Sequence, residues 1–423
     1  MKIIYLHQYF NTPSMSGGTR SYEMARRLVA AGHEVHMVTS FRDTNCLEQD
    51  WFSTNEAGIN VHWLPVPYSN KLSYSKRIQA FFIFAFKAMR KAKELDGDII
   101  FATSTPLTIA LPGVLASKRK NIPMVFEVRD LWPELPIAMG AIKNPLARWL
   151  AHKLEKWAYH HSAAIIALSP GMKAGVVKSG YPASKVAIIP NSSDNKEFSH
   201  DSAAAITFRN ARVWLGDKPL IVYTGTFGKI NGVGYMVELA KKLLPINPDI
   251  RVLLVGGGFE KELITEKAKE SGVLGVNLFI EDYLPKKDIP ALLSAADMAA
   301  CLFIDMPEMQ PNSANKFFDS LASGTPILLN YGGWMHDLVN SHQCGLAMWK
   351  VPLDDVARLV ANKITDINWL KSAGYSAKML AMNEFDRDKL AVQFEDVLNC
   401  AVQSKCNDVA AIAPGDYCVK KSF

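Results

Sequence analysis

The sequence of 423 residues lacks the features of a membrane-spanning or disulfide-stapled protein. No stretch reaches the roughly 18 consecutive apolar residues that a bilayer span requires. The six cysteines stand apart and form neither a Cys-x-x-Cys pair nor a zinc cluster with histidine, which favours a reducing compartment. The apolar run at residues 3–6 gives way at once to polar residues, unlike a signal peptide. We therefore expect a cytoplasmic protein, soluble or resting on a membrane surface.

Several common catalytic motifs are also missing. There is no P-loop, GxSxG or HExxH pattern, and the absence of GxGxxG disfavours a dehydrogenase. We expect no metal site, no cofactor, and surface positions for His152, His160 and His161. The net charge of +6 is compatible with anionic ligands or an anionic membrane, but no aromatic and basic RNA-binding motif accompanies it. We therefore expect no nucleic-acid partner.

What the sequence does contain is a regular alternation of short apolar runs and amphipathic segments. This pattern predicts an α/β protein of two Rossmann-like domains with parallel sheets. Ligands of such sheets bind at the carboxyl ends of the strands, so we expect the active site in a cleft between the two domains. The predicted strands are residues 2–7, 34–40, 58–64, 98–102, 124–128 and 164–168, and then 220–224, 252–255, 276–280, 298–303 and 327–330.

The domain boundaries are predicted from the places where this alternation fails. The polar segment 191–212 lacks strand periodicity, and we interpret it as the joint between the domains. The prediction is an N-terminal acceptor domain (1–195), a C-terminal donor domain (196–385), and a last helix and tail (386–423).

Two glycine-containing turns could bind phosphate. Gly17 and Gly18 precede the first helix, whose N-terminus offers free N–H groups to an anion, and Arg20 lies in its first turn. The turn at 223–232 follows the first strand of the second run and contains Gly225, Thr226, Gly228 and Lys229. Glycines with a lysine form a plausible diphosphate cradle. The alternatives are a flexible loop and a tight turn with a solvated lysine.

A third motif, PNSANKFFDSLASGTP at 311–326, predicts a helix with a cation near its start. Asn312 or Ser313 could cap the helix, Lys316 falls in its first turns, and Asp319 follows at i+3. The lysine could neutralise phosphate, while the aspartate could accept both hydroxyls of a ribose. A solvated ion pair on a surface helix is the alternative.

A fourth motif, FEVRDLWPELP at 126–136, follows a predicted strand. Its charged residues Glu127, Arg129, Asp130 and Glu134 could project into the cleft beside Trp132 and contact a sugar or acceptor. An Arg129–Asp130 network with a purely structural role is the alternative.

The segment 73–93 predicts a basic amphipathic helix. An apolar face of Ile78, Phe81, Phe82, Phe86 and Met89 is accompanied by basic residues, namely Lys76, Arg77, Lys87, Arg90, Lys91 and Lys93. Such a helix can lie on an anionic membrane. A helix that covers the first sheet is an equally good interpretation.

Taken in order, these motifs resemble the retaining family-4 glycosyltransferases of the GT-B fold over about residues 1–400. The resemblance rests on the Gly17-Gly18 loop, GHEV at 32–35, LSPGM at 168–172, IIPNSSD at 188–194, YTGTFGK at 223–229, LLVGGG at 253–258 and FDSLASGTP at 318–326. The HQYFNTP opening and RDLWPE at 129–134 resemble bacterial O-antigen and capsule N-acetyl-L-fucosaminyl transferases. The resemblance implies a UDP-linked sugar donor and a lipid-linked saccharide acceptor at the inner face of the plasma membrane.

The sequence departs from that family at two places. The family has two glutamates eight positions apart, where this chain has Pro311 and Asp319. The family's basic pair in the diphosphate turn is reduced to Lys229, so we expect Lys229 and Lys316 to neutralise the diphosphate. The predicted catalytic residues are Lys229, Lys316, Asp130 and Glu134, and the predicted donor-binding residues are Gly17, Gly18, Arg20, Gly225, Thr226, Gly228, Gly257, Asp282, Tyr283, Asn315 and Asp319.

Two other functions remain open at this point. A nucleotide-sugar epimerase of the same fold would form product from the donor alone. A non-catalytic nucleotide-sugar-binding protein would bind the donor without turnover, and Pro311 in place of a carboxylate keeps this possibility open.

Overall fold

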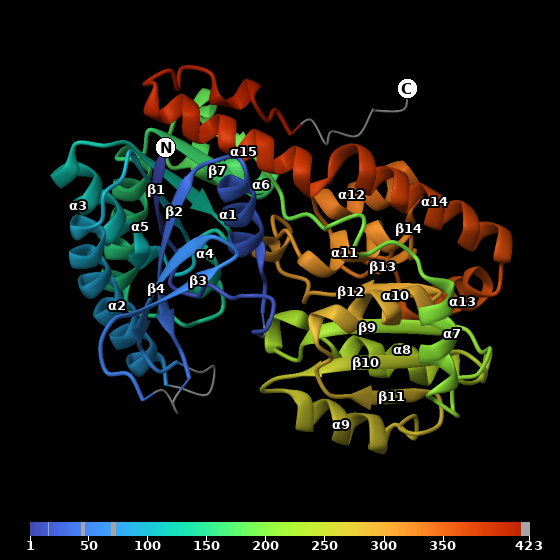
Figure 1. The fold of residues 1–423 in the computed structure, drawn as a ribbon. Helices are drawn as coiled ribbons and strands as arrows, with labels where there is room; N and C mark the ends of the chain where they lie inside the picture. The colour runs from blue at the N-terminus through green and yellow to red at the C-terminus, as the bar shows by residue number, and fades with distance from the viewer. Residues whose placement is uncertain (16, 44–46, 69–72, 416–423) are drawn as a thin grey trace. The chain divides into compact units, whose positions relative to one another are not determined.

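The computed structural model describes residues 1–415 except 16, 44–46 and 69–72 (Figure 1). Cys46, Cys418 and the end of the predicted tail, 416–423, lie outside the described residues. The chain divides into two compact units, each built on its own sheet. Unit 1 contains Met1–Pro190, Pro311–Ser313 and the segment that begins at Asp388, and unit 2 contains Asn191–Gln310 and Ala314–Arg387. The prediction of two largely parallel α/β sheets is confirmed.

The sheet of unit 1 has the strand order β3-β4-β2-β1-β5-β6-β7-β8, and only β3 runs antiparallel to its neighbour. Each strand predicted in this half is present. Two strands were not predicted: β3, whose residues are mostly polar, and the short β8. The strands are β1 (Lys2–Leu6), β2 (Glu34–Phe41), β3 (Phe52–Glu56), β4 (Ile59–Pro65), β5 (Ile99–Thr103), β6 (Met124–Val128), β7 (Ala164–Ala167) and β8 (Val186–Ile188).

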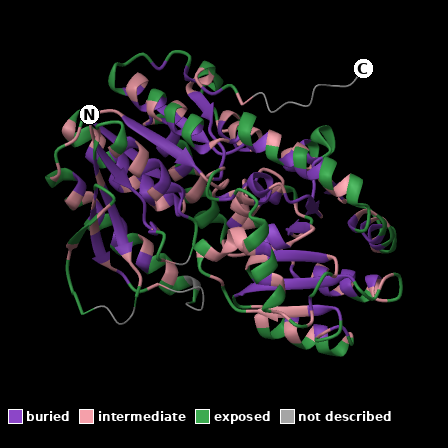
Figure 2. Cartoon of the chain, turned by 45° about the vertical axis from the view of Figure 1, so that its right-hand side comes forward, coloured by how far each residue is buried: buried purple, intermediate pink, exposed green. Residues whose placement is uncertain are grey.

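Helices cover both faces of this sheet, and the strands between them are buried (Figure 2). On one face α2, α3 and α5 pack on the core, and on the other α1 and α15 do so. The C-terminal helix thus belongs to the core of unit 1, where Phe394 lies 4.7 Å from Phe101 between ring centroids. The helices are α1 (Arg20–Ala30), α2 (Tyr74–Glu94), α3 (Ala110–Lys120), α4 (Glu134–Ala138), α5 (Pro145–His160), α6 (Pro170–Lys178) and α15 (Arg387–Val402), with 3-10 turns η1 (Leu107–Ile109), η2 (Ala183–Lys185) and η6 (Val409–Ala411).

The sheet of unit 2 is parallel throughout, with the order β11-β10-β9-β12-β13-β14. All five strands predicted here are present, and β14 is additional. The strands are β9 (Leu220–Thr226), β10 (Arg251–Gly257), β11 (Leu278–Glu281), β12 (Met298–Cys301), β13 (Ile327–Leu329) and β14 (Gly345–Ala347).

The helices of unit 2 begin inside the segment that the sequence analysis interpreted as a joint. Asp201 caps α7 by accepting hydrogen bonds from the N–H groups of Ala203 and Ala204. The helices are α7 (Ser202–Asn210), α8 (Gly234–Leu243), α9 (Lys261–Glu270), α10 (Ile289–Ala295), α11 (Asn315–Ser323), α12 (Trp334–His342), α13 (Leu353–Ile364) and α14 (Ile367–Glu384), with 3-10 turns η3 (Lys229–Asn231), η4 (Lys286–Asp288) and η5 (Pro307–Met309).

Candidate functional site

Lys316 brings a buried positive charge to the carboxyl edge of the unit 2 sheet. It is the second residue of α11, and its Nζ lies 4.0 Å from the centroid of the Tyr223 ring on β9. A Cβ added at Gly225 would come within 2.9 Å of this Nζ. The ammonium is buried and has no hydrogen-bond partner among the described residues. Such a group is unfavourable unless a ligand supplies negative charge.

The protonation of Lys316 reflects the same surroundings. Burial lowers its pKa to about 8, and the nearby Cys301 partly opposes this change. Over the described residues, no acidic side chain forms an ion pair with Lys316. An anion bound beside Nζ would restore the pKa of the ammonium towards its ordinary value, so binding of the anion and charge on the lysine favour each other.

Two glycine-containing loops meet beside Lys316, at the ends of the adjacent strands β9 and β10. The N–H of Phe227 donates to the carbonyl of Gly257 at 2.7 Å, and the Tyr283 hydroxyl donates to the same carbonyl at 2.5 Å. A Cβ at Gly256 would lie 1.9 Å from the carbonyl oxygen of Gly225, and one at Gly258 would lie 2.7 Å from that of Phe227. These glycines are therefore required by the packing of one loop on the other.

The other predicted residues of unit 2 lie around these loops. Lys229 and Thr226 are exposed, and the carbonyl of Thr226 accepts a hydrogen bond from Tyr223 at 2.9 Å. Asp282 pairs with Lys261. The carbonyl of Gly228 accepts a hydrogen bond from the N–H of Asn231 at 2.9 Å, and Asn315 begins α11.

Asp319 has different neighbours from Lys316, although both lie on α11. Burial raises the pKa of Asp319 to about 6, while Ser193, Arg387 and Lys286 oppose this change. Arg387 in turn pairs with Asp194 at 2.5 Å. The ribose-binding role of Asp319 therefore stays a prediction, separate from the lysine that contacts the glycine loop.

Unit 1 contains a pocket of about 240 Å³ at the carboxyl ends of three adjacent strands. It is formed by the loops that follow β1, β5 and β6 together with Gly18 of the loop before α1. This is the position at which parallel α/β sheets bind ligands. The lining residues are His7, Tyr9, Asn11, Gly18, Thr105, Arg129 and Asp130.

The pocket combines a neutral imidazole, a carboxyl group and a guanidinium. Burial, reinforced by Arg129 and Arg42, holds the pKa of His7 well below its usual range. Its Nδ1 is buried and finds no hydrogen-bond partner in the described part of the chain, and its Nε2 lies 3.3 Å from the Arg129 guanidinium. Asp130 accepts a hydrogen bond from the Thr105 hydroxyl at 3.0 Å, and burial raises the pKa of this carboxyl. Such groups can bind the hydroxyls or the anionic part of a substrate.

The loop before α1 contributes backbone to this pocket. Gly17 has a φ of 128°, and a Cβ there would lie 2.6 Å from the Asn11 amide nitrogen. That nitrogen donates to the carbonyl of Gly18 at 3.3 Å. Gly17 is thus required by a tight loop at the edge of the pocket, to which Gly18 contributes its carbonyl.

Arg20 has a structural role that the sequence analysis did not predict. Its guanidinium is buried, pairs with Glu127 at 2.9 Å, and donates to the carbonyls of Ile189 and Pro190. Glu127 also accepts from Thr103 at 2.6 Å. These contacts occupy Arg20 inside unit 1 and remove Glu127 from the pocket, so we do not retain either as a ligand contact.

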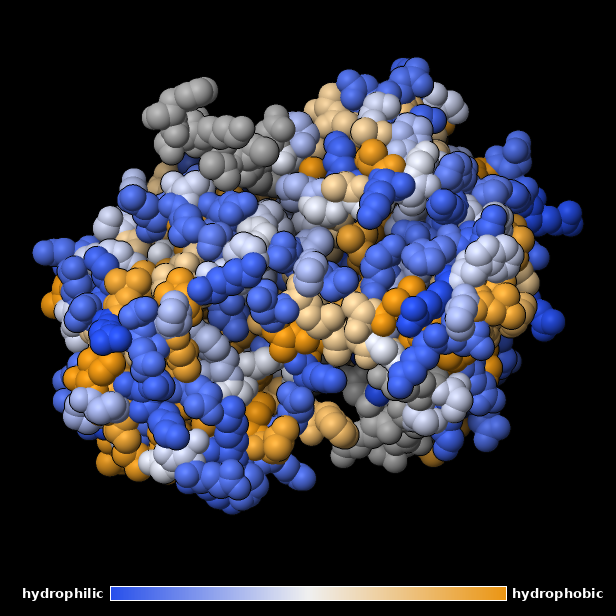
Figure 3. Space-filling view, turned by 180° about the vertical axis from the view of Figure 1, so that it is seen from behind, coloured by the Kyte–Doolittle hydropathy of each residue, from blue (hydrophilic) through white to orange (hydrophobic). Residues whose placement is uncertain are grey.

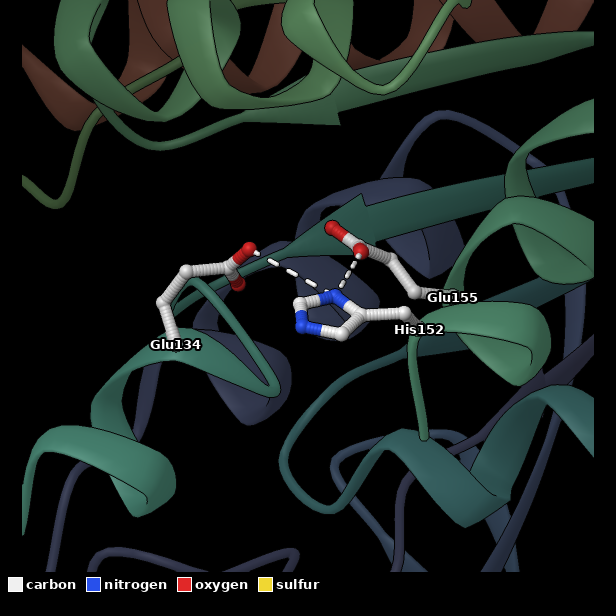
Figure 4. A group of neighbouring side chains, drawn as sticks. All are labelled: Glu134, His152 and Glu155. Carbon is white, nitrogen blue, oxygen red and sulfur yellow. Dashed lines mark ion pairs between the residues drawn. The ribbon is translucent and has the colours of Figure 1, made fainter. Parts of the chain in front are cut away.

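Glu134 is also absent from the pocket that contains Arg129 and Asp130. It begins α4 and faces His152 and Glu155 of α5 (Figure 4). The contact of Glu134 with the acceptor therefore stays a prediction. His152 is partly exposed on α5, and its ring faces two carboxylates.

Several residues at these sites were not predicted from the sequence. His7 directly follows β1, Thr105 follows β5, and Tyr223 lies near the end of β9. Their positions at the ends of predicted strands were a usable signal, since these ends share one edge of the sheet.

Two family models match this chain, one in each half of the sequence. The glycosyl transferase 4-like domain matches residues 17–192, and the glycosyl transferases group 1 domain matches residues 206–377. The colanic acid biosynthesis glycosyl transferase WcaI of Escherichia coli K12 is 24% identical over 302 residues, 68% of this chain and 73% of WcaI. The glycosyltransferase WbjE of Pseudomonas aeruginosa is 21% identical over 325 residues, 75% of this chain and 79% of WbjE.

A solved structure with the same fold is that of Anabaena HepE in complex with UDP-glucose. It is 18% identical, has a TM-score of 0.71, and the likeness covers 94% of this chain and 99% of HepE. Fold and sequence together define a glycosyltransferase of the GT-B class. The chain belongs to the GT-B superfamily of family 4 and group 1 glycosyltransferases, with the two domains in that order along the sequence.

Proposed function

We propose that this glycosyltransferase moves a sugar from a UDP-sugar to a lipid-linked saccharide during the synthesis of a surface polysaccharide. The name of WcaI, a colanic acid biosynthesis glycosyl transferase, supports a role in polysaccharide synthesis. The UDP-glucose bound to HepE supports a UDP-sugar as the donor. The observation that carries the donor assignment is the buried, unpartnered ammonium of Lys316 beside the Gly225 loop. N-acetyl-L-fucosamine is the proposed sugar and retention the proposed stereochemistry, both from the sequence resemblance.

In the proposed mechanism, unit 2 holds the nucleotide diphosphate. As the glycosidic bond breaks, negative charge accumulates on the leaving diphosphate, and a preorganised cation stabilises it. Lys316 provides this charge from a fixed position, and the exposed Lys229 adds a second. Asp319 would bind the ribose hydroxyls, and the segment Asp282–Tyr283 would hold the base with Asn315 nearby.

The pocket of unit 1 is the proposed acceptor site. His7 and Asp130 would orient acceptor hydroxyls, while Arg129 would interact with an anionic group of the acceptor. The low pKa of His7 supports this role, because a neutral imidazole can accept a hydrogen bond from a hydroxyl.

A transfer assay with purified protein tests this function. We expect UDP release from UDP-N-acetyl-L-fucosamine only when a polyprenyl-diphosphate-linked sugar is present, together with a product enlarged by one sugar. UDP-glucose and GDP-mannose serve as donor controls. A donor converted to its epimer without an acceptor, or selective use of GDP-mannose, would contradict the proposal.

We further propose that α2 rests on an anionic membrane. Small residues form most of its buried face, including Ala80, Ala88 and Ala92 around Phe84. Of the predicted apolar face, Phe81 and Met89 are partly buried and the other residues are exposed. Ile78, Phe82, Ile83 and Phe86 are 42–61% exposed instead. Exposed basic residues accompany them, namely Lys76, Lys87, Arg90 and Lys93.

A second helix on the same face of the unit 1 sheet has similar character. Leu146, Trp149 and Leu150 of α5 are more than half exposed, next to the exposed Arg148 and Lys153. Seen from behind, the surface is largely hydrophilic, with apolar side chains gathered in separate patches (Figure 3). In the described part of the chain, no helix is long and apolar enough to cross a membrane. Surface contact through exposed aromatic and basic side chains fits these observations.

Vesicle sedimentation tests this contact. The double variant Phe82→Ser and Phe86→Ser is expected to bind vesicles containing anionic phospholipid at least about tenfold more weakly, because two apolar side chains no longer enter the interface. Leu263→Ser, an exposed apolar position on α9 of unit 2, is the control and should bind as wild type does. Equal binding by the double variant would refute the proposed surface.

A further inference from the structure

Glu134, His152 and Glu155 form a cluster that the transfer mechanism does not use. Glu134 begins α4, while His152 and Glu155 are one turn apart on α5. Figure 4 shows the two carboxylates approaching the same ring nitrogen of His152. One oxygen of Glu134 lies 3.8 Å from this Nδ1, and one of Glu155 lies 3.5 Å from it. The ligand atoms all lie within 4.8 Å of one another.

These separations are too long for hydrogen bonds, which join nitrogen and oxygen at about 2.7–3.2 Å. They are closer to the spacing of ligands around a metal ion. With metal–ligand distances of about 2.0–2.2 Å, neighbouring ligands of a tetrahedral site lie about 3.3–3.6 Å apart. The 3.5 Å separation lies in this range and the 3.8 Å separation is slightly longer, so there is room for an ion between the imidazole and the two carboxylates.

The charges of the cluster favour a cation. Glu155 is buried, with its side chain 4% exposed, and the second oxygen of Glu134 is buried without a hydrogen-bond partner. Across the part of the chain that the structure describes, His152 is the only basic side chain paired with either carboxylate. Two carboxylates are thus held together with too little positive charge.

We propose that Glu134, His152 and Glu155 bind a divalent first-row transition metal ion, with Zn²⁺ as the representative ligand. One imidazole and two carboxylates suit such an ion, and the half-exposed Glu134 and His152 leave water access to a fourth position. The ion joins α4 to α5. Because α4 directly follows the segment that supplies Arg129 and Asp130 to the pocket, the site stabilises that segment and takes no part in bond breaking.

Metal binding by the purified full-length protein tests the site without any measurement of glycosyl transfer. After removal of metals with a chelator, Zn²⁺ is expected to raise the melting temperature of the wild-type protein. Co²⁺ is expected to give visible absorption bands from one bound ion per chain. Glu134→Gln and His152→Ala should each weaken binding by about 100-fold or more, since even the loss of a residue that only supports a ligand weakens binding by about 10–100-fold. His160→Ala, on the same helix, is the control and should bind as wild type does.

Glu155→Gln separates loss of a ligand from loss of the fold. Without metal, this variant should be at least as stable as wild type, because it removes a buried charge. With Zn²⁺, wild type should gain stability while the variant does not. A wild-type protein that gains no stability from Zn²⁺, or variants at all three positions that gain as much as wild type, would overturn the proposal. A wild-type protein without any gain from Zn²⁺ would indicate that Glu134 and Glu155 share a proton instead.

Discussion

Lys316→Met is expected to lower turnover by about 100- to 1,000-fold and to raise the melting temperature by a few degrees. Turnover falls because the leaving diphosphate loses a preorganised cation. Stability rises because methionine fills a similar volume without burying an unpartnered ammonium. Steady-state kinetics and calorimetric unfolding of the same preparations measure the two effects.

The opposite signs of these effects make the prediction specific. Lys242→Met is the matched control, since Lys242 pairs with Asp354 at the surface of unit 2 and should affect neither quantity strongly. A Lys316→Met protein that turns over within about threefold of wild type would remove Lys316 from the mechanism. A protein that loses activity because it unfolds would show a structural role for the lysine instead.

Arg20→Met is expected to destabilise the protein by about 3–5 kcal/mol, because it leaves the fully buried carboxylate of Glu127 without its cation. In a unit of this size, each kcal/mol corresponds to roughly 2–4 °C in melting temperature. Calorimetric unfolding should therefore show a fall of roughly 6–20 °C. The double variant Arg20→Met with Glu127→Leu should recover much of the loss, because both buried charges are then removed.

Arg26→Met is a suitable control on the same helix. Arg26 pairs with Glu23 at 2.6 Å and is 37% exposed, so its loss should change stability by about 1 kcal/mol or less. If Arg20→Met unfolded at the wild-type temperature but lost affinity for UDP, the phosphate-binding role expected from the sequence would be restored.

The fold could be predicted because each buried parallel strand is a short apolar run flanked by turn residues. This signal identified β1 and β9, for example. It failed for β3, whose residues Phe52–Glu56 are mostly exposed, and which pairs with β4 through a turn at Ala57 and Gly58 with positive φ. An exposed edge strand carries no apolar pattern, so hydrophobic periodicity cannot reveal it.

Local sequence singled out two residues, Gly225 and Lys316, that the structure brings together. Gly225 and Lys316 stood out because glycine loops and helix starts have recognisable sequences. The pairing of Arg20 with Glu127, 107 positions away, has no local signature. The proximity of Glu134 to His152 has no local signature either, because it depends on where the helix at 145–160 packs.

The central claim is that Lys316 contacts the diphosphate of the donor. Calorimetric titration of wild type and Lys316→Met with UDP and with uridine isolates this contact, because the two ligands differ only in the diphosphate. We expect wild type to prefer UDP strongly, and Lys316→Met to lose about 10- to 100-fold of that preference while binding uridine as before. An undiminished preference for UDP in the variant would contradict the account and direct attention to Lys229.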